Sequence, residues 1–347
     1  MKAALYKEPN KIEVEDIPIP EPLDNEIQIK VASTGICGTD IHLYKAIGAF
    51  NPDVNRVFGH EFGGIITKAG KDVPEEFKVG QRVVVEPNIG CGKCKTCIAG
   101  NYVQCEKGQR IIGIHRNGGF AEYMVAPHEK VFHIPDNFTF KQASAFEPFA
   151  ICVYGIKRAP IVPGDIVVIM GPGTAGLHFT MLAKACGASK VILTGPNQAR
   201  LDLGKRIGAD VIVNIREKDL VKEVMKETDG KGADYVFEAA GVQDSLENMS
   251  RVAANKAKIC IYGVPVGTIN NVDFSEYLFK DVTLVTASGA PNTFAQGIKI
   301  VASGIVDTAK VISHTFPLDE IEKAFEVVDK RLNGVSKAAV MINPDIK

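Results

Sequence analysis

The sequence has no run of about 18 or more apolar residues, so no segment is predicted to cross a membrane as a helix. Residues 1–8 lack the apolar core of a signal peptide. Positive and negative side chains nearly cancel, with a formal net charge of -1, which gives no electrostatic reason to expect nucleic acid or an anionic membrane as a partner. No internal repeat or low-complexity segment stands out. These absences predict a soluble, cytoplasmic protein.

The length and two contrasting sequence patterns indicate two domains. At 347 residues the chain exceeds the usual size of a single hydrophobic core. In 11–17 and 26–31 apolar and polar residues largely alternate, and 81–87 is a further predicted strand. This pattern favours antiparallel strands with one solvated face. From Pro163 onward apolar runs alternate with helical segments, which is typical of a doubly wound parallel sheet.

A glycine-rich turn between a strand and a helix is the clearest motif of the second half. Residues 166–170 form an apolar run of strand length, and 171–177 fit G-x-G-x-x-G. In this order Gly171, Gly173 and Gly176 can make the turn, admit a pyrophosphate and pack helix on strand, with the helix N-terminus facing the phosphates. The segment therefore predicts a dinucleotide-binding domain.

The limits of this domain are predicted at about residues 151 and 288. Its helices are predicted at 175–186 and 220–227, and its further strands at 190–194, 210–213, 234–238, 258–262 and 281–285. The last stretch, 289–347, is predicted to return to the first domain, with helices at 294–302 and 318–328 and a strand at 338–342.

Four of the eight cysteines lie close together and four are isolated. Cys91, Cys94, Cys97 and Cys105 can close a tetrahedron with no open position, which predicts a structural zinc site. An iron–sulfur cluster is an alternative, although the proline that follows the bacterial pattern is absent. Four unligated thiols are the remaining possibility. Without a secretory signal, clustered cysteines favour metal over disulfides.

A second group of metal-binding residue types lies between Gly35 and Gly64. Cys37, His60 and Glu61 offer a thiolate, an imidazole and a carboxylate, which are the ligand types of a catalytic zinc with one open position. A buried, reduced cysteine and a hydrogen-bonded histidine are the alternative, since free cysteine is among the most buried residue types. The sequence predicts a catalytic metal site on loops of the β-rich domain.

Taken together, the motifs resemble those of the zinc-containing medium-chain dehydrogenase/reductase family, and within it the polyol (sorbitol or iditol type) and threonine dehydrogenases. The resemblance spans the whole chain, through 35–40, 59–61, the four cysteines, 118–123, 147–148 and 171–176. It implies a GroES-like, β-rich catalytic domain over 1–150, a Rossmann domain over 151–288 and a return to the catalytic domain over 289–347.

The resemblance also implies roles for individual residues around the catalytic zinc. Cys37 and His60 match the zinc ligands of the family, while Glu61 and Glu147 match acids that ligate zinc or hold its water in the polyol branch. Liver-type alcohol dehydrogenases carry a cysteine where Glu147 stands. A carboxylate there makes the metal surroundings harder and richer in oxygen.

Two further residues match a proton relay. Zinc lowers the pKa of an alcohol hydroxyl, and the released proton must leave through a dry pocket. Thr39 matches the hydroxyl that passes the proton on, and His42 matches the residue that delivers it to solvent through the cofactor ribose. Capping of the following helix is the alternative role for Thr39.

The nucleotide is expected to be NAD or NADP. The turn Gly171, Gly173, Thr174, Ala175 and Gly176 is expected to hold the pyrophosphate. An NAD-type fingerprint places an acid at the end of the second strand, whereas this sequence has Gly195 there. The missing acid favours NADP, and the possible phosphate partners are Thr194, Asn197 and Arg200. For Arg200 a solvated charge on a helix is the alternative, since NAD-using relatives of the polyol type have a similarly placed arginine.

The expected reaction is hydride transfer between a secondary alcohol or polyol and the nucleotide, with L-threonine as an alternative substrate. The substrate pocket is expected near Ile41, Phe50, Phe58 and His115. The family resemblance implies a homotetramer. A zinc-free quinone reductase or a non-catalytic nucleotide-binding protein on the same fold are the competing hypotheses, and each would have lost some of these ligands.

Overall fold

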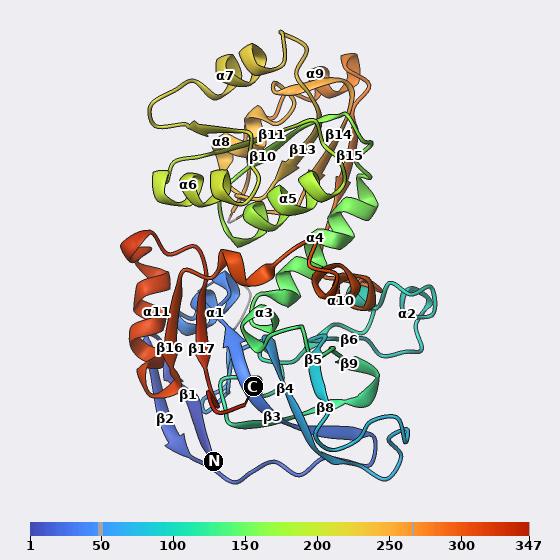
Figure 1. Cartoon of the computed structure of the whole chain (residues 1–347), viewed down its shortest axis with the longest axis vertical. Coiled ribbons are helices and arrows are strands. Elements are labelled where there is room, and N and C mark those ends of the chain that lie inside the picture. The colour runs from blue at the N-terminus through green and yellow to red at the C-terminus, as the bar shows by residue number, and fades with distance from the viewer. Residues whose placement is uncertain (48–50, 266, 347) are drawn as a thin grey trace. The chain divides into compact units, whose positions relative to one another are not determined.

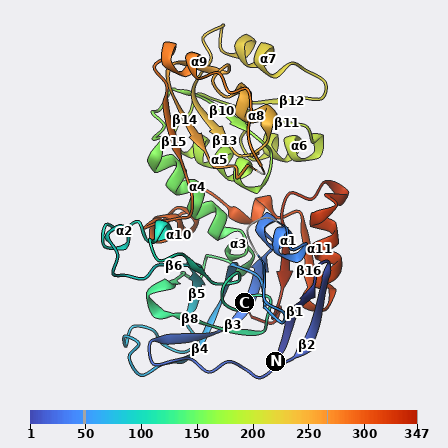
Figure 2. The same ribbon diagram turned by 180° about the vertical axis from the view of Figure 1, so that it is seen from behind.

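The computed structural model describes residues 1–47, 51–265 and 267–346, so Phe50 lies outside the described residues. The chain divides into two compact units, which are labelled by their helices and strands in Figure 1 and seen from behind in Figure 2. Unit 1 comprises 1–150 and 289–347, and unit 2 comprises 151–288. The cofactor motif and the metal motifs therefore belong to different units.

Unit 1 is rich in β-strands. Its strands are β1 (Lys2–Glu8), β2 (Lys11–Asp16), β3 (Glu26–Gly35), β4 (Glu61–Ala69), β5 (Arg82–Val85), β6 (Asn88–Ile89), β7 (Arg110–Ile111), β8 (Tyr123–Pro127), β9 (Val131–His133), β16 (His314–Pro317) and β17 (Ala338–Met341). The largest sheet has the order β16-β17-β3-β4-β5-β9, and β8 also pairs with β3. All these pairs are antiparallel except β16 with β17.

The expectation of solvated strand faces is wrong for β3. Its polar residues Glu26 and Gln28 are buried, in a part of β3 that pairs with β4 on one side and with β8 on the other. Arg116 forms an ion pair with Glu26, while Gln28 accepts a hydrogen bond from Thr67 and donates one to the carbonyl of Pro20. These partners offset the cost of taking polar groups out of water.

The helices of unit 1 are short and lie between the strands in sequence. They are α1 (Gly38–Tyr44), α2 (Lys95–Ile98), α3 (Phe140–Ala143), α10 (Phe294–Ala302) and α11 (Ile321–Asp329), with single 3₁₀ turns η1 (Tyr102–Gln104), η2 (His128–Lys130), η3 (Thr308–Val311), η4 (Leu318–Glu320) and η5 (Leu332–Gly334). Helix α4 (Phe146–Arg158) begins in unit 1 and continues into unit 2. The predicted helices at 294–302 and 318–328 and the predicted strand at 338–342 are confirmed within one to three residues.

Unit 2 is a six-stranded parallel sheet with the order β12-β11-β10-β13-β14-β15. Its strands are β10 (Ile166–Met170), β11 (Lys190–Gly195), β12 (Val211–Asn214), β13 (Ala233–Glu238), β14 (Ala253–Ile261) and β15 (Thr283–Thr286). In chain order this is 3-2-1-4-5-6, the order of a dinucleotide-binding doubly wound fold. The predicted fold class is confirmed.

Helices connect the parallel strands of unit 2. They are α5 (Thr174–Ala185), α6 (Gln198–Arg206), α7 (Leu220–Glu227), α8 (Gln243–Asn248) and α9 (Phe274–Phe279). Helix α7 begins where the Asp219 carboxylate accepts a hydrogen bond from the Lys222 amide at 2.9 Å. This N-cap satisfies a helix donor that would otherwise lack a partner.

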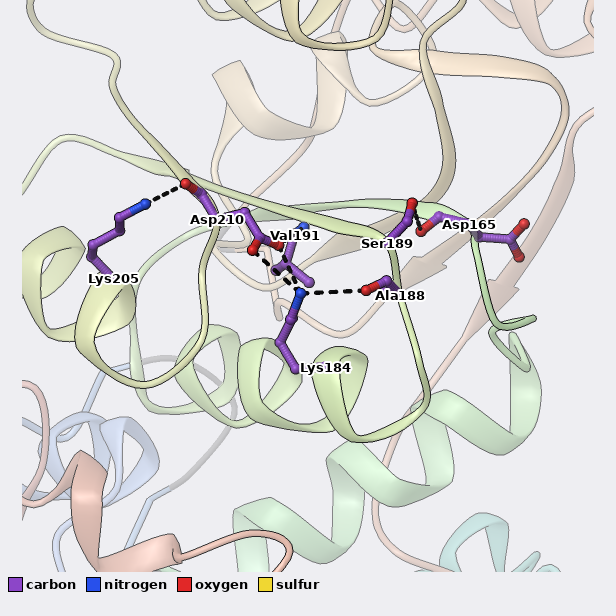
Figure 3. Close-up of polar contacts among 7 residues, drawn as sticks. All are labelled: Asp165, Lys184, Ala188, Ser189, Val191, Lys205 and Asp210. Carbon is purple, nitrogen blue, oxygen red and sulfur yellow. Dashed lines mark hydrogen bonds and ion pairs between the residues drawn. The ribbon is translucent and has the colours of Figure 1, made fainter.

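Hydrogen bonds connect residues at the amino ends of β10, β11 and β12, which are neighbouring strands of unit 2 (Figure 3). The Asp210 carboxylate, just before β12, accepts hydrogen bonds from the Val191 amide of β11 at 2.7 Å and from Lys184 Nζ at 3.0 Å. The backbone oxygen of Asp210 accepts one from Lys205. Ser189 Oγ donates to the Asp165 carbonyl before β10 at 3.1 Å. The glycine-rich turn lies at the opposite edge of the sheet, directly after the carboxyl end of β10.

Across the described parts of the chain, no helix is long and apolar enough to span a lipid bilayer.

Candidate active site and metal centres

Among the described residues, two groups of His, Cys, Asp or Glu side chains bring their donor atoms within 4.8 Å of one another. One consists of Cys91, Cys94, Cys97 and Cys105, and the other of Cys37, His60 and Glu61. Both belong to unit 1, and both are the groups that the sequence predicts. All eight cysteines of the chain are free thiols.

The four cysteines form what we call the cysteine lobe, residues 88–111. The Sγ atoms of Cys91 and Cys97 lie 4.0 Å apart, as do those of Cys94 and Cys105. A tetrahedral site with Zn–S bonds of about 2.3 Å requires sulfur atoms roughly 3.8 Å apart. The geometry therefore fits a zinc ion bound by four sulfurs, without an open position.

Hydrogen bonds around the lobe favour the ionised form of two of the four thiols, whereas burial raises the pKa of the Cys97 thiol to about 11. The amides of Lys93 and Cys94 donate to Cys91 Sγ at 3.5 and 3.4 Å, and these hydrogen bonds lower the pKa of the Cys91 thiol. The Thr96 hydroxyl lies 3.1 Å from Cys94 Sγ and lowers the pKa of that thiol. Such donors stabilise negative charge on sulfur and are part of a thiolate metal site.

A buried charged cluster attaches the lobe to the remainder of unit 1. Lys130 Nζ lies 3.3 Å from Glu86 Oε2 and 3.6 Å from the centre of the Tyr102 ring. The Tyr102 hydroxyl accepts a hydrogen bond from the Asn292 amide at 3.0 Å, and Asn292 Nδ2 donates to the Gly100 carbonyl at 3.1 Å. The sequence pattern did not indicate this cluster, because its members are far apart in the chain.

Strand pairing assembles the second metal group. Strand β3 ends at Gly35, which pairs with Glu61 at the start of β4, so Cys37 follows β3 close to His60 and Glu61. His60 and Glu61 are buried, and Cys37 is partly exposed. A thiolate, an imidazole and a carboxylate with one partly open side fit a catalytic zinc.

Asp40 holds this group in place from the first turn of α1. Its carboxylate is fully buried and accepts hydrogen bonds from the amides of Cys37 at 2.8 Å and Gly59 at 3.3 Å. The same carboxylate lies 3.4 Å from His60 Nδ1. Burial lowers the pKa of His60, but the charges of Asp40 and Cys37 outweigh it and the pKa is well above its usual value. Asp40 therefore orients both ligands.

Lys337 supplies a buried positive charge that sequence reasoning missed. It precedes β17, whose pairing with β3 places it beside the metal group, and its ammonium forms an ion pair with the Glu61 carboxylate. Both side chains are at most 3% exposed. Burial lowers the pKa of Lys337, but Glu61, Cys37 and Asp40 raise it above its usual value. The only sequence signal is a lysine directly before an apolar strand.

Gly35 leaves room for this ion pair. A Cβ at position 35 would lie 2.0 Å from the Ser144 carbonyl oxygen and 2.5 Å from Glu61 Oε2. Contacts that short do not occur, so position 35 requires glycine for steric reasons.

Glu147 lies in the first turn of α4, is 6% exposed and stays outside the group of three donors that lie within 4.8 Å of one another. Burial raises the pKa of its carboxyl to about 8, with Glu61 adding to the shift and His60 and Lys337 opposing it. A nearby cation would stabilise the ionised carboxylate. A metal held by the three donors would therefore lower the pKa of Glu147, although Glu147 is not a fourth donor within 4.8 Å of the others.

Thr39 and His42 both belong to α1. Cys37 is the N-cap of this helix, so Thr39 is not its capping residue. Thr39 is partly buried and His42 is exposed. Residues three apart lie on one helix face. Thr39 therefore lies at a half-buried position of this face, and His42 lies one helical turn further along at the surface.

In unit 2 the glycine-rich turn has the close packing that a dinucleotide site requires. Gly171 has φ = 107°, and a Cβ at Gly176 would lie 1.8 Å from the Gly171 carbonyl oxygen. A Cβ at Gly173 would meet no atom within 4 Å, so the turn is open at this residue, which is also the N-cap of α5. Thr174 and Ala175 are the first residues of α5, so their amides lie at the N-terminus of this helix, and this arrangement fits a pyrophosphate.

The possible phosphate partners near Gly195 differ in their surroundings. Thr194 is buried and its hydroxyl donates to the Ile169 carbonyl at 3.4 Å, so it points into the sheet. Asn197 is the N-cap of α6, where its Oδ1 accepts from the Arg200 amide at 3.1 Å. Arg200 lies in the first turn of the same helix and is partly exposed.

Two family models match the chain. Residues 23–136 match the alcohol dehydrogenase GroES-like domain, and residues 175–303 match the zinc-binding dehydrogenase family. The first match contains the three donors Cys37, His60 and Glu61 and the cysteine lobe, and the second contains most of unit 2.

Curated relatives match along almost the entire chain. Sorbitol dehydrogenase of Bacillus subtilis (strain 168) is 34% identical over 99% of this chain and 98% of its own length. L-threonine 3-dehydrogenase of Marinomonas sp. (strain MWYL1) is 35% identical over 92% of this chain and 93% of its own. Two relatives of nearly equal identity to this chain, 34% and 35%, thus carry different substrate names.

Solved structures agree in fold and carry nicotinamide nucleotides. A protein of Sinorhizobium meliloti 1021, solved bound to NADP, is 32% identical and has a TM-score of 0.92 over 98% of this chain and 99% of its own. An alcohol dehydrogenase of Escherichia coli CFT073, solved with NADH, is 28% identical with a TM-score of 0.91 over 99% of each chain.

Proposed function

The chain belongs to the zinc-containing medium-chain dehydrogenase/reductase family and is a zinc-dependent NAD(P) dehydrogenase, and we propose that its substrate is a secondary alcohol or polyol. The observation that supports this proposal most is the oxygen-rich metal group: Cys37 and His60 with the carboxylate Glu61, and the buried carboxyl of Glu147 nearby. Carboxylates in place of thiolates make the surroundings of the metal harder and more accepting of hydroxyl-rich ligands.

Each residue of the site has a separate task in this proposal. Zinc, when bound, supplies a Lewis acid that lowers the pKa of the substrate hydroxyl. Cys37, His60 and Glu61 would hold the metal, and Asp40 keeps the first two of them oriented. The turn at 171–176 would hold the pyrophosphate, so that the nicotinamide ring can accept the hydride.

We assign the departing proton to Thr39 and His42. Thr39 is partly buried on α1 and His42 is exposed on the same helix face, so a proton released near Cys37 has a hydroxyl and then an imidazole on its route to water. A histidine suits the outer position because its usual pKa lies near neutrality. Replacing Thr39 by valine would remove the hydroxyl with little change in shape, and serine is the matched control.

L-threonine is the second candidate substrate. It is favoured by the L-threonine 3-dehydrogenase relatives, of which one is 35% identical to this chain, compared with 34% for the sorbitol dehydrogenase. Threonine differs from a polyol in carrying a carboxylate and an ammonium group, so its binding requires charged partners that a polyol does not need.

The test is the initial rate of nicotinamide reduction with sorbitol, xylitol, 2,3-butanediol and L-threonine, each with NAD and with NADP. A clear rate with a polyol or diol and little with threonine supports the proposal. A rate with threonine alone would replace it by the amino-acid substrate. Thr39→Val should lower the rate about 100-fold in either case while Thr39→Ser retains it, because general acid–base steps contribute about that much. Equal rates of both variants would exclude the relay.

We also propose that the chain forms a homo-oligomer in the cytoplasm. Strand β15 is the last strand of its sheet, and the neighbouring helix α9 exposes Phe274, Leu278 and Phe279 by 65%, 75% and 83%. An unpaired edge beside exposed apolar side chains is suited to pairing with a second copy. Phe279→Lys should shift the oligomer towards monomer in analytical ultracentrifugation.

The cysteines support the proposed cytoplasmic location. All eight are free thiols, which fits a reducing compartment.

A further inference from the structure

Gly195, at the end of β11, packs directly against the ring of Pro172. A Cβ at position 195 would lie 2.2 Å from Pro172 Cδ and 2.7 Å from Pro172 Cγ. Ordinary carbon contacts are 3.5–4.0 Å. Pro172 is buried and its ring has a fixed φ, so it cannot rotate away as a flexible side chain could. No side chain fits at position 195 while Pro172 occupies the second position of the glycine-rich turn.

Position 195 is the place where an NAD-type site carries its acid. The end of the second strand of such a fold places an Asp or Glu against the ribose hydroxyls, and that carboxylate repels a 2′-phosphate. The acid is therefore not simply missing at position 195. Pro172 also leaves no space for an acidic side chain there. The two residues act as one steric unit.

We infer that the contact between Pro172 and Gly195 makes this site select a nucleotide with a 2′-phosphate, NADP, over NAD. The inference rests on the proposed dehydrogenase function only in that the turn at 171–176 binds a nicotinamide nucleotide. Pro172 and Gly195 are specificity-determining residues here, and they act by shaping the space beside the ribose.

The charges around Gly195 agree with a phosphate ligand. Arg200 lies in the first turn of α6, which directly follows β11. On the other side Gly195 pairs with Asn214, the Ile215 amide donates to the Gly195 carbonyl at 3.1 Å, and the exposed Arg216 comes next. Two arginines thus flank the strand end, and arginine is the residue best suited to phosphate oxygens.

The nearby acids have other partners. Glu217 accepts a hydrogen bond from Asn214 Nδ2 at 3.0 Å, and Asp202 accepts one from Gln198 Nε2 at 2.8 Å. Neither carboxylate takes the place of an acid at 195, because neither belongs to the end of β11. Arg200 and Arg216 are therefore the groups beside Gly195 that suit an anion.

The first experiment compares direct binding of nucleotides by titration calorimetry, without substrate. The unaltered protein should bind NADP at least about tenfold more tightly than NAD, and 2′,5′-ADP more tightly than 5′-ADP by a similar factor. Arg200→Ala should remove most of this difference, because it weakens the binding of NADP more than that of NAD. Lys205→Ala is the matched control, because Lys205 lies at the other end of α6 and bonds to the Asp210 carbonyl.

The second experiment tests the steric unit. Gly195→Asp alone should weaken the binding of both nucleotides at least about tenfold and lower the melting temperature, since its Cβ collides with Pro172. Pro172→Ala alone should keep the preference for NADP. The double variant Pro172→Ala/Gly195→Asp should recover the melting temperature and prefer NAD, because the acid then has space.

Three results would overturn the inference: equal binding of 2′,5′-ADP and 5′-ADP by the unaltered protein, tight NAD binding by a stable Gly195→Asp variant, or a double variant that still prefers NADP. If Gly195→Asp does not fold, the double variant and the ADP pair still decide. Failure of the dehydrogenase proposal would leave these binding constants unchanged and would appear only as absent turnover. The two failures are therefore distinguishable.

Discussion

The two metal groups of unit 1 differ in how far apart in the chain their parts lie. The donors of the cysteine lobe lie within 91–105 and are supported by amides two or three residues away. The second group combines Cys37 with His60 and Glu61, and it depends on Lys337 near the end of the chain. A local site can shape a loop by itself, whereas the donors of the second site come together only when β3 and β4 have paired, and Lys337 joins them through the pairing of β17 with β3. We expect loss of zinc from the cysteine lobe to disorder the lobe, and loss of zinc from the second group to lower turnover.

The sharpest test of this difference is Cys37→Ser. We expect turnover to fall at least about 1,000-fold, because zinc contributes several kcal/mol of transition-state stabilisation. The metal content should fall from two zinc ions per chain to one, as measured by atomic absorption. The melting temperature should change by less than about 3 °C, because Cys37 is partly exposed and Asp40 bonds to its backbone amide rather than to its side chain.

Cys186→Ser is the matched control for Cys37→Ser, since Cys186 is a partly exposed cysteine outside both metal groups. It should leave turnover and zinc content unchanged. Full activity of Cys37→Ser with a single zinc ion per chain would exclude the catalytic role of this group.

The next largest effect is expected for Lys337→Met, which removes the buried charge but retains an unbranched side chain. Glu61 would lose its ion-pair partner inside the protein, and breaking a buried pair costs about 3 kcal/mol or more. Urea denaturation should show this fall in the free energy of unfolding. The double variant Glu61→Gln/Lys337→Met should recover part of it, since no unpaired charge remains.

If Lys337→Met and the double variant have the same stability, the ion pair does not couple β17 to the metal group. The second site would then depend on the pairing of β3 with β4 and not on β17. The single variant Glu61→Gln completes a double-mutant cycle, which measures this coupling directly.

The sequence predicts those parts of each site whose residues lie close together in the chain better than those parts that come from distant segments. The cysteine lobe and the donors Cys37, His60 and Glu61 could be predicted, because their residue types and spacing carry the chemistry. Lys337 could not, since a lone lysine before a strand has no partner until the sheet forms. Glu147 entered only through a family resemblance, and the geometry leaves it outside the close group.

The fold shows a similar pattern. The parallel strands of unit 2 could be predicted because strands buried on both faces are continuous apolar runs, as in β10 and β11. The burial of Glu26 and Gln28 in β3 could not be, because it depends on partners that lie 90 and 39 residues away. The reason for Gly195 was also hidden, since it lies in the contact with Pro172.

For the cysteine lobe the corresponding change is Cys94→Ser. Zinc binding to the lobe should weaken, and limited proteolysis within the lobe should become at least about tenfold faster, because the site stabilises only a local segment. Turnover of the intact fraction should stay within about threefold of the unaltered protein. A loss of turnover as large as that of Cys37→Ser would show that the two sites are not independent.

The smallest expected effect concerns the attachment of the lobe, through Tyr102→Phe. The ring stays beneath Lys130, whereas the Asn292 amide loses its acceptor, so the free energy of unfolding should fall by about 0.5–1 kcal/mol. Lys130→Met is the complementary variant, because it removes the charge beside Glu86 and keeps the hydroxyl of Tyr102. It should cost more than Tyr102→Phe, since Glu86 is 2% exposed and would be left without that cation. The reverse order of the two effects would mean that Asn292, and not the buried charge pair, holds the lobe, and that the attachment is as local as the zinc site itself.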